Sequence, residues 1–328
     1  MSEKIKEIIE SNIKFSHLGI ISGKTFTFEV ANDIKKHFNC ALSHFTVATN
    51  SFDEGNRIST LVKENGIDVL LAIGGGKVLD VAKYVSNKTG KKLIVCPTTL
   101  SHDGISSVVA VLKQKDKFHS IATHAPVCII IDIDIVKRAR DEQIKAGAGD
   151  LLSNLSAVED WILAHKLKGE KFDPLSEMIA RNAAEEFIRF VLKNRKINIR
   201  EDEFLYELAR CLALSGIAMN IAGSSRPCSG AEHLISHALD KLLKKSKPHG
   251  IQVGIATLYT QKLRKKNSSI IKKVYNKISF PTKLSQIGID ENIFMEAVKI
   301  APQMRKGRFT ILDIKGETEK LNAIKEIK

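Results

Sequence analysis

Short apolar runs alternate with helix-like segments over the first 133 residues of the chain. The apolar runs are rich in Ile, Leu and Val, which is typical of strands in a buried sheet. Between them, amphipathic segments end near Phe38 and at Asn65, where Gly66 occupies the position expected of a helix C-cap. Strands that alternate with helices predict βαβ units and a parallel sheet covered on both faces. The expected strands are 17–22, 45–49, 68–73, 92–96 and 127–132, with a hairpin of 108–112 and 118–123 before the last one.

The pattern changes after residue 138. From Asp141 onward the apolar positions follow a helical period, over 173–200, over 201–222 and from Gly254 to the last residue. We therefore predict an α/β Rossmann-like domain with a parallel sheet over 1–138 and an all-α domain over 139–328. A chain of 328 residues is long enough for two domains with buried cores.

Three glycines, Gly74 to Gly76, follow the buried strand 68–73 and precede a helical stretch. Glycines let a backbone approach a ligand closely, and the first turn of the helix offers N–H groups and the positive end of its dipole. The turn is therefore a candidate seat for a pyrophosphate. It matches neither Gly-x-Gly-x-x-Gly nor a Walker loop. Taken alone, a tight turn without a ligand explains it equally well.

A polar loop, residues 97–107, follows the strand 92–96. Ligands bind at the carboxyl ends of strands in open α/β sheets. Asp103 could hold a substrate hydroxyl. The hydroxyl groups that could bond a hydroxyl or a phosphate are those of Thr98, Thr99, Ser101 and Ser107. A loop chosen only for turn chemistry is the alternative, but its length exceeds what a simple connection requires and favours function.

Three histidines in the second half are candidate metal ligands. His233 and His237 are four residues apart, so on a helix they lie on one face. His249 follows a Lys-rich connection, with Pro248 at the expected start of the next helix. These imidazoles could bind a divalent metal if a carboxylate joined them. A surface helix with ordinary histidines is the alternative, and the Arg-Pro and Ser-Gly steps before it and the Pro-His-Gly after it favour a site.

Asp150 is a candidate for that carboxylate. It lies in an otherwise apolar stretch, near Leu151 and Leu155, after two Gly-Ala steps that allow close helix packing. A carboxylate there is costly to bury unless it is paired or bound to a metal. A helix N-cap or a solvated face is the alternative.

Composition narrows the classes of function. A hydrophobic share of 43% argues against disorder, no apolar run reaches the ~18 residues of a membrane span, and the first residues lack the apolar core of a signal peptide. We therefore expect a cytoplasmic protein. The five scattered cysteines indicate reduced thiols rather than a thiolate metal site. The formal charge of +14 comes mostly from dispersed lysine, which indicates a solvated surface that attracts anionic ligands, not nucleic acid.

Five segments in order make the chain resemble the sn-glycerol-1-phosphate dehydrogenase family of archaea. This family is related to glycerol dehydrogenase, the iron-type alcohol dehydrogenases and dehydroquinate synthase. The resemblance covers nearly the whole chain, and the run from Ser225 is specific to the glycerol-1-phosphate branch. The segments are Gly-Gly-Gly-Lys-Val-Leu-Asp (74–80), Pro-Thr-Thr-Leu-Ser-His-Asp-Gly (97–104), Gly-Ala-Gly-Asp (147–150), Ser-Arg-Pro-Cys-Ser-Gly-Ala-Glu-His (225–233) and Pro-His-Gly (248–250).

The resemblance implies roles for individual residues. It implies one zinc ion per subunit, held by Asp150, His233 and His249. It implies catalytic roles for His237 and Asp103, and contacts with the substrate by Asp103, Asp150 and His237. The implied contacts with NAD(H) or NADP(H) are Gly76, Lys77, Val78, Leu79, Asp80, Thr98, Thr99, Leu100, Ser101 and Ser107.

The implied reaction is the NAD(P)H-dependent reduction of dihydroxyacetone phosphate to sn-glycerol 1-phosphate, the backbone of archaeal ether lipids. Its active site is expected in the cleft between the two domains, with zinc acting as a Lewis acid on the carbonyl. Arg226 and nearby lysines are candidates for the phosphate. Either nucleotide is plausible, because Asn50 replaces the acidic residue that usually binds the ribose 2′-hydroxyl. We also expect a homo-oligomer. A glycerol dehydrogenase is the alternative enzyme, and a basic nucleic-acid-binding protein the alternative from another class.

Overall fold

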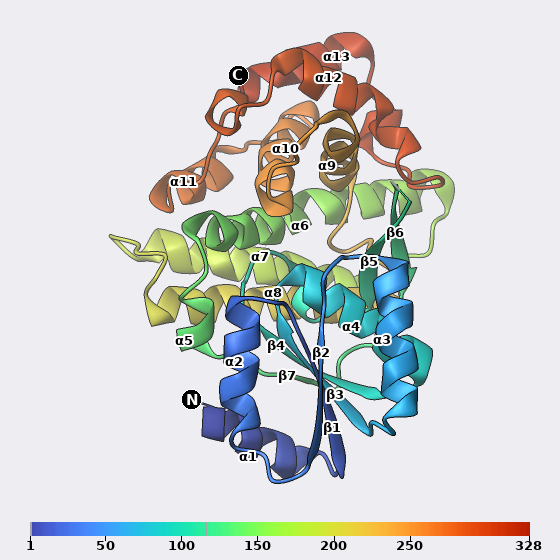
Figure 1. Ribbon diagram of the computed structural model, residues 1–328. Helices are drawn as coiled ribbons and strands as arrows, with labels where there is room; N and C mark the ends of the chain where they lie inside the picture. The colour runs from blue at the N-terminus through green and yellow to red at the C-terminus, as the bar shows by residue number, and fades with distance from the viewer. Residues whose placement is uncertain (1, 116) are drawn as a thin grey trace. The chain divides into compact units, whose positions relative to one another are not determined.

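The computed structural model describes residues 2–115 and 117–328 and divides the chain into two compact units (Figure 1). The first unit comprises Met1–Leu100 and Gly104–Ala139, and the second comprises Ser101–Asp103 and Arg140–Lys328. The short segment Ser101–Asp103 therefore packs with the second unit, although it follows a strand of the first.

A parallel sheet forms the centre of the first unit. Within the described residues it has five strands in the order β2-β1-β3-β4-β7, and every neighbouring pair runs parallel. This arrangement confirms the α/β class predicted for the first half. The strands are β1 (His17–Ser22), β2 (Ala41–Thr46), β3 (Val69–Gly74), β4 (Lys92–Pro97) and β7 (Cys128–Ile129).

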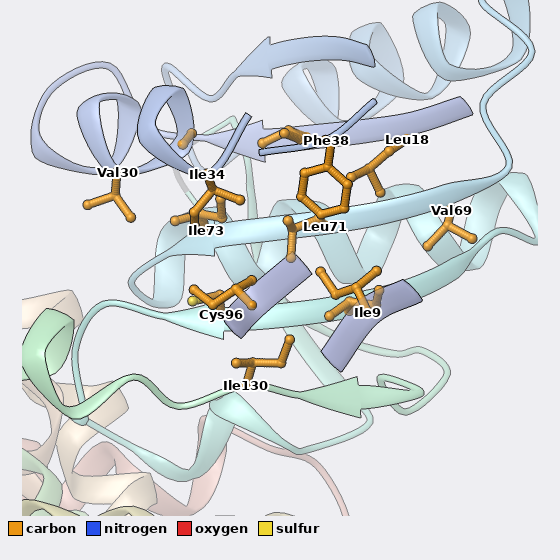
Figure 2. Close-up of a cluster of buried hydrophobic side chains, with 14 of the residues drawn as sticks. Ile9, Leu18, Val30, Ile34, Phe38, Val69, Leu71, Ile73, Cys96 and Ile130 are labelled. Atoms are coloured by element: carbon orange, nitrogen blue, oxygen red, sulfur yellow. The ribbon is translucent and has the colours of Figure 1, made fainter. Parts of the chain in front are cut away.

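Helices cover both faces of this sheet, as the buried strands require. Every second residue of the central strands faces α1 and α2, and the register aligns Ile20 with Leu71 and Leu71 with Ile94. These side chains belong to one buried cluster with Ile9 and Ile34 of the covering helices, part of which is shown in Figure 2. The opposite face packs against α4, which in turn packs on α3. The helices are α1 (Ser2–Asn12), α2 (Phe26–Lys35), α3 (Phe52–Glu64) and α4 (Gly76–Thr89).

Two predicted strands need correction. The strand predicted at 45–49 is wrong, because β2 spans Ala41–Thr46 and pairs Ala41 with His17. It is an edge strand with polar residues among its apolar ones, which weakened the hydrophobic pattern. The last strand, predicted at 127–132, is limited to Cys128–Ile129. Asp132 already caps the next helix, α5 (Ile133–Val136), by accepting hydrogen bonds from its first amides.

The predicted hairpin is confirmed. Strand β5 (Val109–Gln114) pairs antiparallel with β6 (Lys117–Ala122) outside the main sheet. Asn50 holds this hairpin, because its side-chain amide donates to the carbonyl of Val111 and its own carbonyl accepts from Lys113.

The second unit is helical, as predicted. Its longest helix, α6, is buried along most of its length, and Trp161 is only 2% exposed. A helix that buries residues all round lies at the centre of its unit. The helices are α6 (Asp141–Lys168), α7 (Pro174–Lys193), α8 (Asp202–Ala222), α9 (Ala231–Leu242), α10 (His249–Leu263), α11 (Ser269–Lys277), α12 (Glu291–Ile300) and α13 (Glu317–Ala323).

One described helix, α8, is long and apolar enough to cross a membrane when judged by length and composition alone. Of its most apolar 18-residue window, 56% is buried inside the protein. Burial of that kind is also found in the core helices of globular proteins, which pass the same test.

Candidate active site

The glycine-rich turn joins β3 to α4 and lies beside the end of β4. The amide of Thr98 donates to the carbonyl of Gly74 at 3.0 Å, a typical length for a hydrogen bond of this kind. A Cβ atom on Gly75 would be 3.3 Å from Thr99 Oγ1, so a glycine keeps the two loops in close contact. Gly75 caps α4 without a side chain, which leaves the first amides of the helix exposed to a ligand.

The predicted nucleotide-binding residues occupy different environments in the first unit, except Ser101, which belongs to the second unit. Val78 and Leu79 are buried and their amides already donate to the carbonyl of Gly75. The amides of Gly76 and Lys77 precede them and have no capping side chain. An anion at this turn would therefore meet Gly76 and Lys77 first.

A buried lysine that the sequence reasoning missed fixes the far end of the polar loop. The ammonium group of Lys83, on α4, donates to the carbonyl of Gly104, to Ser107 Oγ at 3.2 Å and to the carbonyl of Val109 at 2.9 Å. Asp80 Oδ1 lies 3.9 Å from it. The side chain is fully buried, so these partners replace the water that the ammonium group would otherwise bind.

In the second unit the structure brings the predicted metal ligands together. Asp150 lies within α6, His233 in the first turn of α9, and His249 is the first residue of α10. One ligand atom from each lies within 4.8 Å of the others. Asp150 Oδ1 is 3.5 Å from His233 Nε2 and 3.7 Å from His249 Nε2. Asp150 is therefore in mid-helix and buried, not an N-cap or a solvated carboxylate.

Two glycines explain how α6 and α10 come close enough for this. A Cβ atom on Gly149 would lie 2.2 Å from the carbonyl oxygen of Gly250, and one on Gly250 would lie 1.9 Å from that of Ala146. Real Cβ atoms do not tolerate such distances, so any larger residue would push the helices apart. The Gly-Ala steps noted in the sequence thus place Asp150 against His249.

The residues around the cluster orient both imidazoles toward Asp150. His233 Nδ1 is 3.0 Å from Glu232 Oε1, and His249 Nδ1 is 3.2 Å from Ser236 Oγ. Each ring therefore directs its Nε2 atom to the shared point. One carboxylate and two imidazoles match the donors that catalytic zinc prefers, and three protein ligands leave a coordination position open. The residues present fit a zinc ion.

The charges in the cluster favour a cation. Burial opposes protonation of His233, but its hydrogen bonds to Asp150 and Glu232 outweigh burial and raise its pKa to about 10. Burial also opposes ionisation of Asp150, yet the hydrogen bond and charge of His233 lower its pKa below the ordinary value. Asp150 and Glu232 thus place negative charge around His233, which favours a cation at this point.

Comparison with known proteins assigns the family. The glycerol-1-phosphate dehydrogenase [NAD(P)+] of Pyrococcus horikoshii is 40% identical over 300 residues, which cover 92% of this chain and 85% of that protein. The protein of the same name from Pyrococcus furiosus is 39% identical over 299 residues, 91% of this chain and 84% of that protein. The chain belongs to the glycerol-1-phosphate dehydrogenase family. The resemblance seen in the sequence is thereby confirmed.

Two further similarities agree with this family assignment. Residues 1–139 match the sequence model of the iron-containing alcohol dehydrogenases. The crystal structure of a probable glycerol dehydrogenase from Sinorhizobium meliloti has a TM-score of 0.76 and 19% identity, and the match covers 98% of this chain and 92% of that one. At this identity the structural match supports the fold alone.

In this member of the glycerol-1-phosphate dehydrogenase family, the predicted catalytic residues lie beside the predicted metal ligands. The rings of His237 and His249 are stacked, with centroids 5.9 Å apart. The backbone amide of Asp103 donates to Asp150 Oδ2 at 2.9 Å. Asp103, Asp150, His233, His237 and His249 therefore form one group within the second unit.

Two more residues belong to this group, although the sequence reasoning did not assign them. His102 interacts electrostatically with Asp150 and His249. Cys228 is buried, and burial followed by the charges of Asp103 and Asp150 raises the pKa of its thiol well above the ordinary value. Both residues stand in segments that carry the family resemblance, and that position was the sign in the sequence that they could belong to the site.

Arg226, a candidate for the substrate phosphate, is engaged elsewhere. It is 2% exposed, forms an ion pair with Glu170, and donates from Nη1 to the carbonyl of Phe309 at 2.9 Å. These contacts give Arg226 a structural role, because they tie the loop before α9 to the segment around Phe309.

Proposed function

We propose that this chain catalyses the NAD(P)H-dependent reduction of dihydroxyacetone phosphate to sn-glycerol 1-phosphate. The observation that carries the proposal is the convergence of Asp150, His233 and His249 in a chain 40% identical to a protein named glycerol-1-phosphate dehydrogenase [NAD(P)+]. A carboxylate and two imidazoles suit a metal that polarises a carbonyl group.

We assign nucleotide binding to the first unit and metal and substrate binding to the second. The exposed amides of Gly76 and Lys77 at the N-terminus of α4 are suited to the pyrophosphate of NAD(P)H. The hydroxyl groups of Thr98, Thr99 and Ser107 follow on the neighbouring loop. The nicotinamide supplies the hydride when the nucleotide is bound.

Zinc is the metal we assign to Asp150, His233 and His249, and when bound it supplies Lewis-acid stabilisation of the negative charge that develops on the substrate oxygen. Glu232 and Ser236 keep the Nε2 atoms of the two histidines directed at the site. His237, stacked on His249, is placed to hydrogen-bond the substrate and relay the proton that completes the alcohol. Asp103 holds a substrate hydroxyl.

The product would supply the glycerophosphate backbone of archaeal ether lipids. A reaction that uses a soluble phosphate ester and a soluble nucleotide suits the cytoplasm, where we place the protein. We also propose that it acts as a homo-oligomer, which sedimentation of the purified protein can test.

The deciding experiment measures the oxidation of NADH and of NADPH by the zinc-loaded protein with dihydroxyacetone phosphate and with dihydroxyacetone. We expect kcat/KM to be at least about 100-fold higher for the phosphate, because a site built for a charged group rejects the analogue that lacks it. Chiral analysis of the product should give sn-glycerol 1-phosphate. Equal or greater activity on dihydroxyacetone would indicate a glycerol dehydrogenase instead, and no turnover of either compound would overturn the proposal.

A further inference from the structure

Three arginines join two loops of the second unit. Arg226 donates to the carbonyl of Phe309, while Arg305 and Arg308 reach back to the loop before α9. Arg308 Nη1 donates to the carbonyl of Ser229 at 2.7 Å. Arg305 and Arg308 belong to a basic stretch, 305–308, which the structure places against the loop that leads into α9.

Two of these arginines converge on one hydroxyl group. Arg305 Nη1 lies 2.8 Å from Ser225 Oγ, and Arg308 Nη2 lies 3.0 Å from the same atom. An oxygen that accepts from two guanidinium groups has its own hydrogen left to donate. Among the described residues, no acceptor for that hydrogen is seen, although Ser225 is only 8% exposed.

Arg305 and Arg308 have no ion-pair partner of their own among the described residues, and Glu170 and Glu232 act on Arg308 only from beyond ion-pair range. Arg226, by contrast, has Glu170 as its ion-pair partner. Arg308 is only 7% exposed. Burial, followed by the charges of Arg305 and Arg226, lowers the pKa of Arg308 to about 9. A buried cation without a counter-ion is costly, and a bound anion would relieve that cost.

This positive point lies close to the proposed reaction centre. Ser229 immediately precedes Gly230, the N-cap of α9, and α9 carries His233 and His237. The hydrogen bond from Arg308 Nη1 to the carbonyl of Ser229 thus places this guanidinium group next to the start of the helix that carries both histidines. An anion held there would lie beside the start of the helix that carries two of the proposed site residues.

We propose that Arg305, Arg308 and Ser225 bind the phosphate group of the substrate. The inference rests on the proposed function and adds the residues that distinguish a phosphorylated from an unphosphorylated triose. Two guanidinium groups supply charge-assisted hydrogen bonds to phosphate oxygens, and the Ser225 hydroxyl supplies a third donor. Arg226 and Glu170 hold the two loops in place and do not contact the phosphate.

The test compares Arg305→Gln and Arg308→Gln with Arg305→Lys in the zinc-loaded full-length protein. We expect each glutamine variant to lose about 10- to 100-fold in kcat/KM for dihydroxyacetone phosphate, as expected when a charged hydrogen bond is removed. The kcat/KM for dihydroxyacetone should change less than about 3-fold, because that substrate has no charged group to hold. Arg305→Lys keeps the charge and should recover part of the loss.

Lys306→Gln is the matched control. Lys306 is exposed, lies between the two arginines in sequence, and its replacement removes the same charge. We expect it to keep the wild-type preference for the phosphate. A loss equal to that of Arg305→Gln would show that only the net charge of the loop matters and would overturn the assignment.

A binding measurement separates this inference from the proposed function. Inorganic phosphate should inhibit the wild-type enzyme competitively with dihydroxyacetone phosphate, and calorimetry should show that the Arg305→Gln protein binds phosphate at least about 10-fold more weakly. If the wild type does not prefer the phosphorylated substrate, the proposed function fails. If the wild type prefers it and both glutamine variants keep that preference and their affinity for phosphate, the arginine assignment alone is wrong.

Discussion

The backbone amide of Asp103 donates a hydrogen bond to Oδ2 of Asp150, across 47 positions of the sequence. The other oxygen, Oδ1, is the one that faces His233 and His249. One carboxylate is thus divided between two tasks, because Oδ2 is fixed by the polar loop while Oδ1 is directed to the proposed metal. The segment Ser101–Asp103 packs with the second unit, which keeps this contact inside a single compact body.

Replacing Asp150 with Asn tests the charge of this carboxylate while its size is kept. We expect the metal content of Asp150→Asn to fall below about 0.1 equivalents per chain after dialysis, because an amide is a poor zinc ligand. Elemental analysis measures the metal, and circular dichroism should show an unchanged fold. His124→Ala, which removes an exposed histidine from the first unit, should retain the wild-type content. Full zinc occupancy in Asp150→Asn would exclude Asp150 as a ligand.

Glu232 tests whether the orientation of His233 matters to metal affinity. Its Oε1 atom lies 3.0 Å from His233 Nδ1 and also accepts from the amide of Gly230 at 2.6 Å. We expect Glu232→Gln to weaken zinc binding about 10- to 100-fold, the usual effect of removing a hydrogen-bond partner behind a metal ligand. Competition with a chromophoric chelator measures the affinity. Glu296→Gln, an exposed change in the same unit, serves as the control, and equal affinities for both variants would refute the role.

Much of the fold follows from local patterns in the sequence. The strands around Leu71 and Ile94 are buried on both faces and therefore read as continuous apolar runs. The edge strand β2 was misplaced because Ser43 and His44 interrupt its pattern, and β7 was predicted too long because Asp132 serves the following helix. Local periodicity carries no information on which residue will end a strand by capping a helix.

The candidate site likewise contains residues that the sequence indicated and a residue that it did not. Asp150, His233 and His249 were predicted because they stand in segments that resemble a known family. Arg308 was not assigned, because its contact with Ser225 joins loops 83 residues apart and neither loop has a period. Long-range polar contacts of this kind depend on how the helices pack and leave no regular pattern in the sequence.

The close approach of α6 and α10 predicts a strong effect at Gly149. A methyl group there would meet the carbonyl oxygen of Gly250 at 2.2 Å and the ring of Phe280 at 2.7 Å. We expect Gly149→Ala to lower the free energy of unfolding by about 1–3 kcal/mol, in the range of overpacked cores. Urea unfolding monitored by fluorescence measures it. Gly316→Ala is the control, since Gly316 has nothing within 4 Å and an ordinary φ of −73°, so its effect should stay below about 1 kcal/mol. Equal losses would contradict the packing argument.

Asp68 makes a pH-dependent contribution to the stability of the first unit. Its Oδ2 atom accepts from the amide and hydroxyl of Ser16 and from the amide of His17, and these bonds lower its pKa to about 2. Because the folded pKa is below the unfolded value of about 3.9, the contribution is complete above about pH 4 and is lost as the pH falls toward 2. We therefore expect Asp68→Asn to be less stable than the wild type at pH 7, with the difference shrinking between pH 4 and 2. Urea midpoints of both proteins across this range measure the difference, and a gap that stays constant down to pH 2 would show that the charge of Asp68 has no part in it.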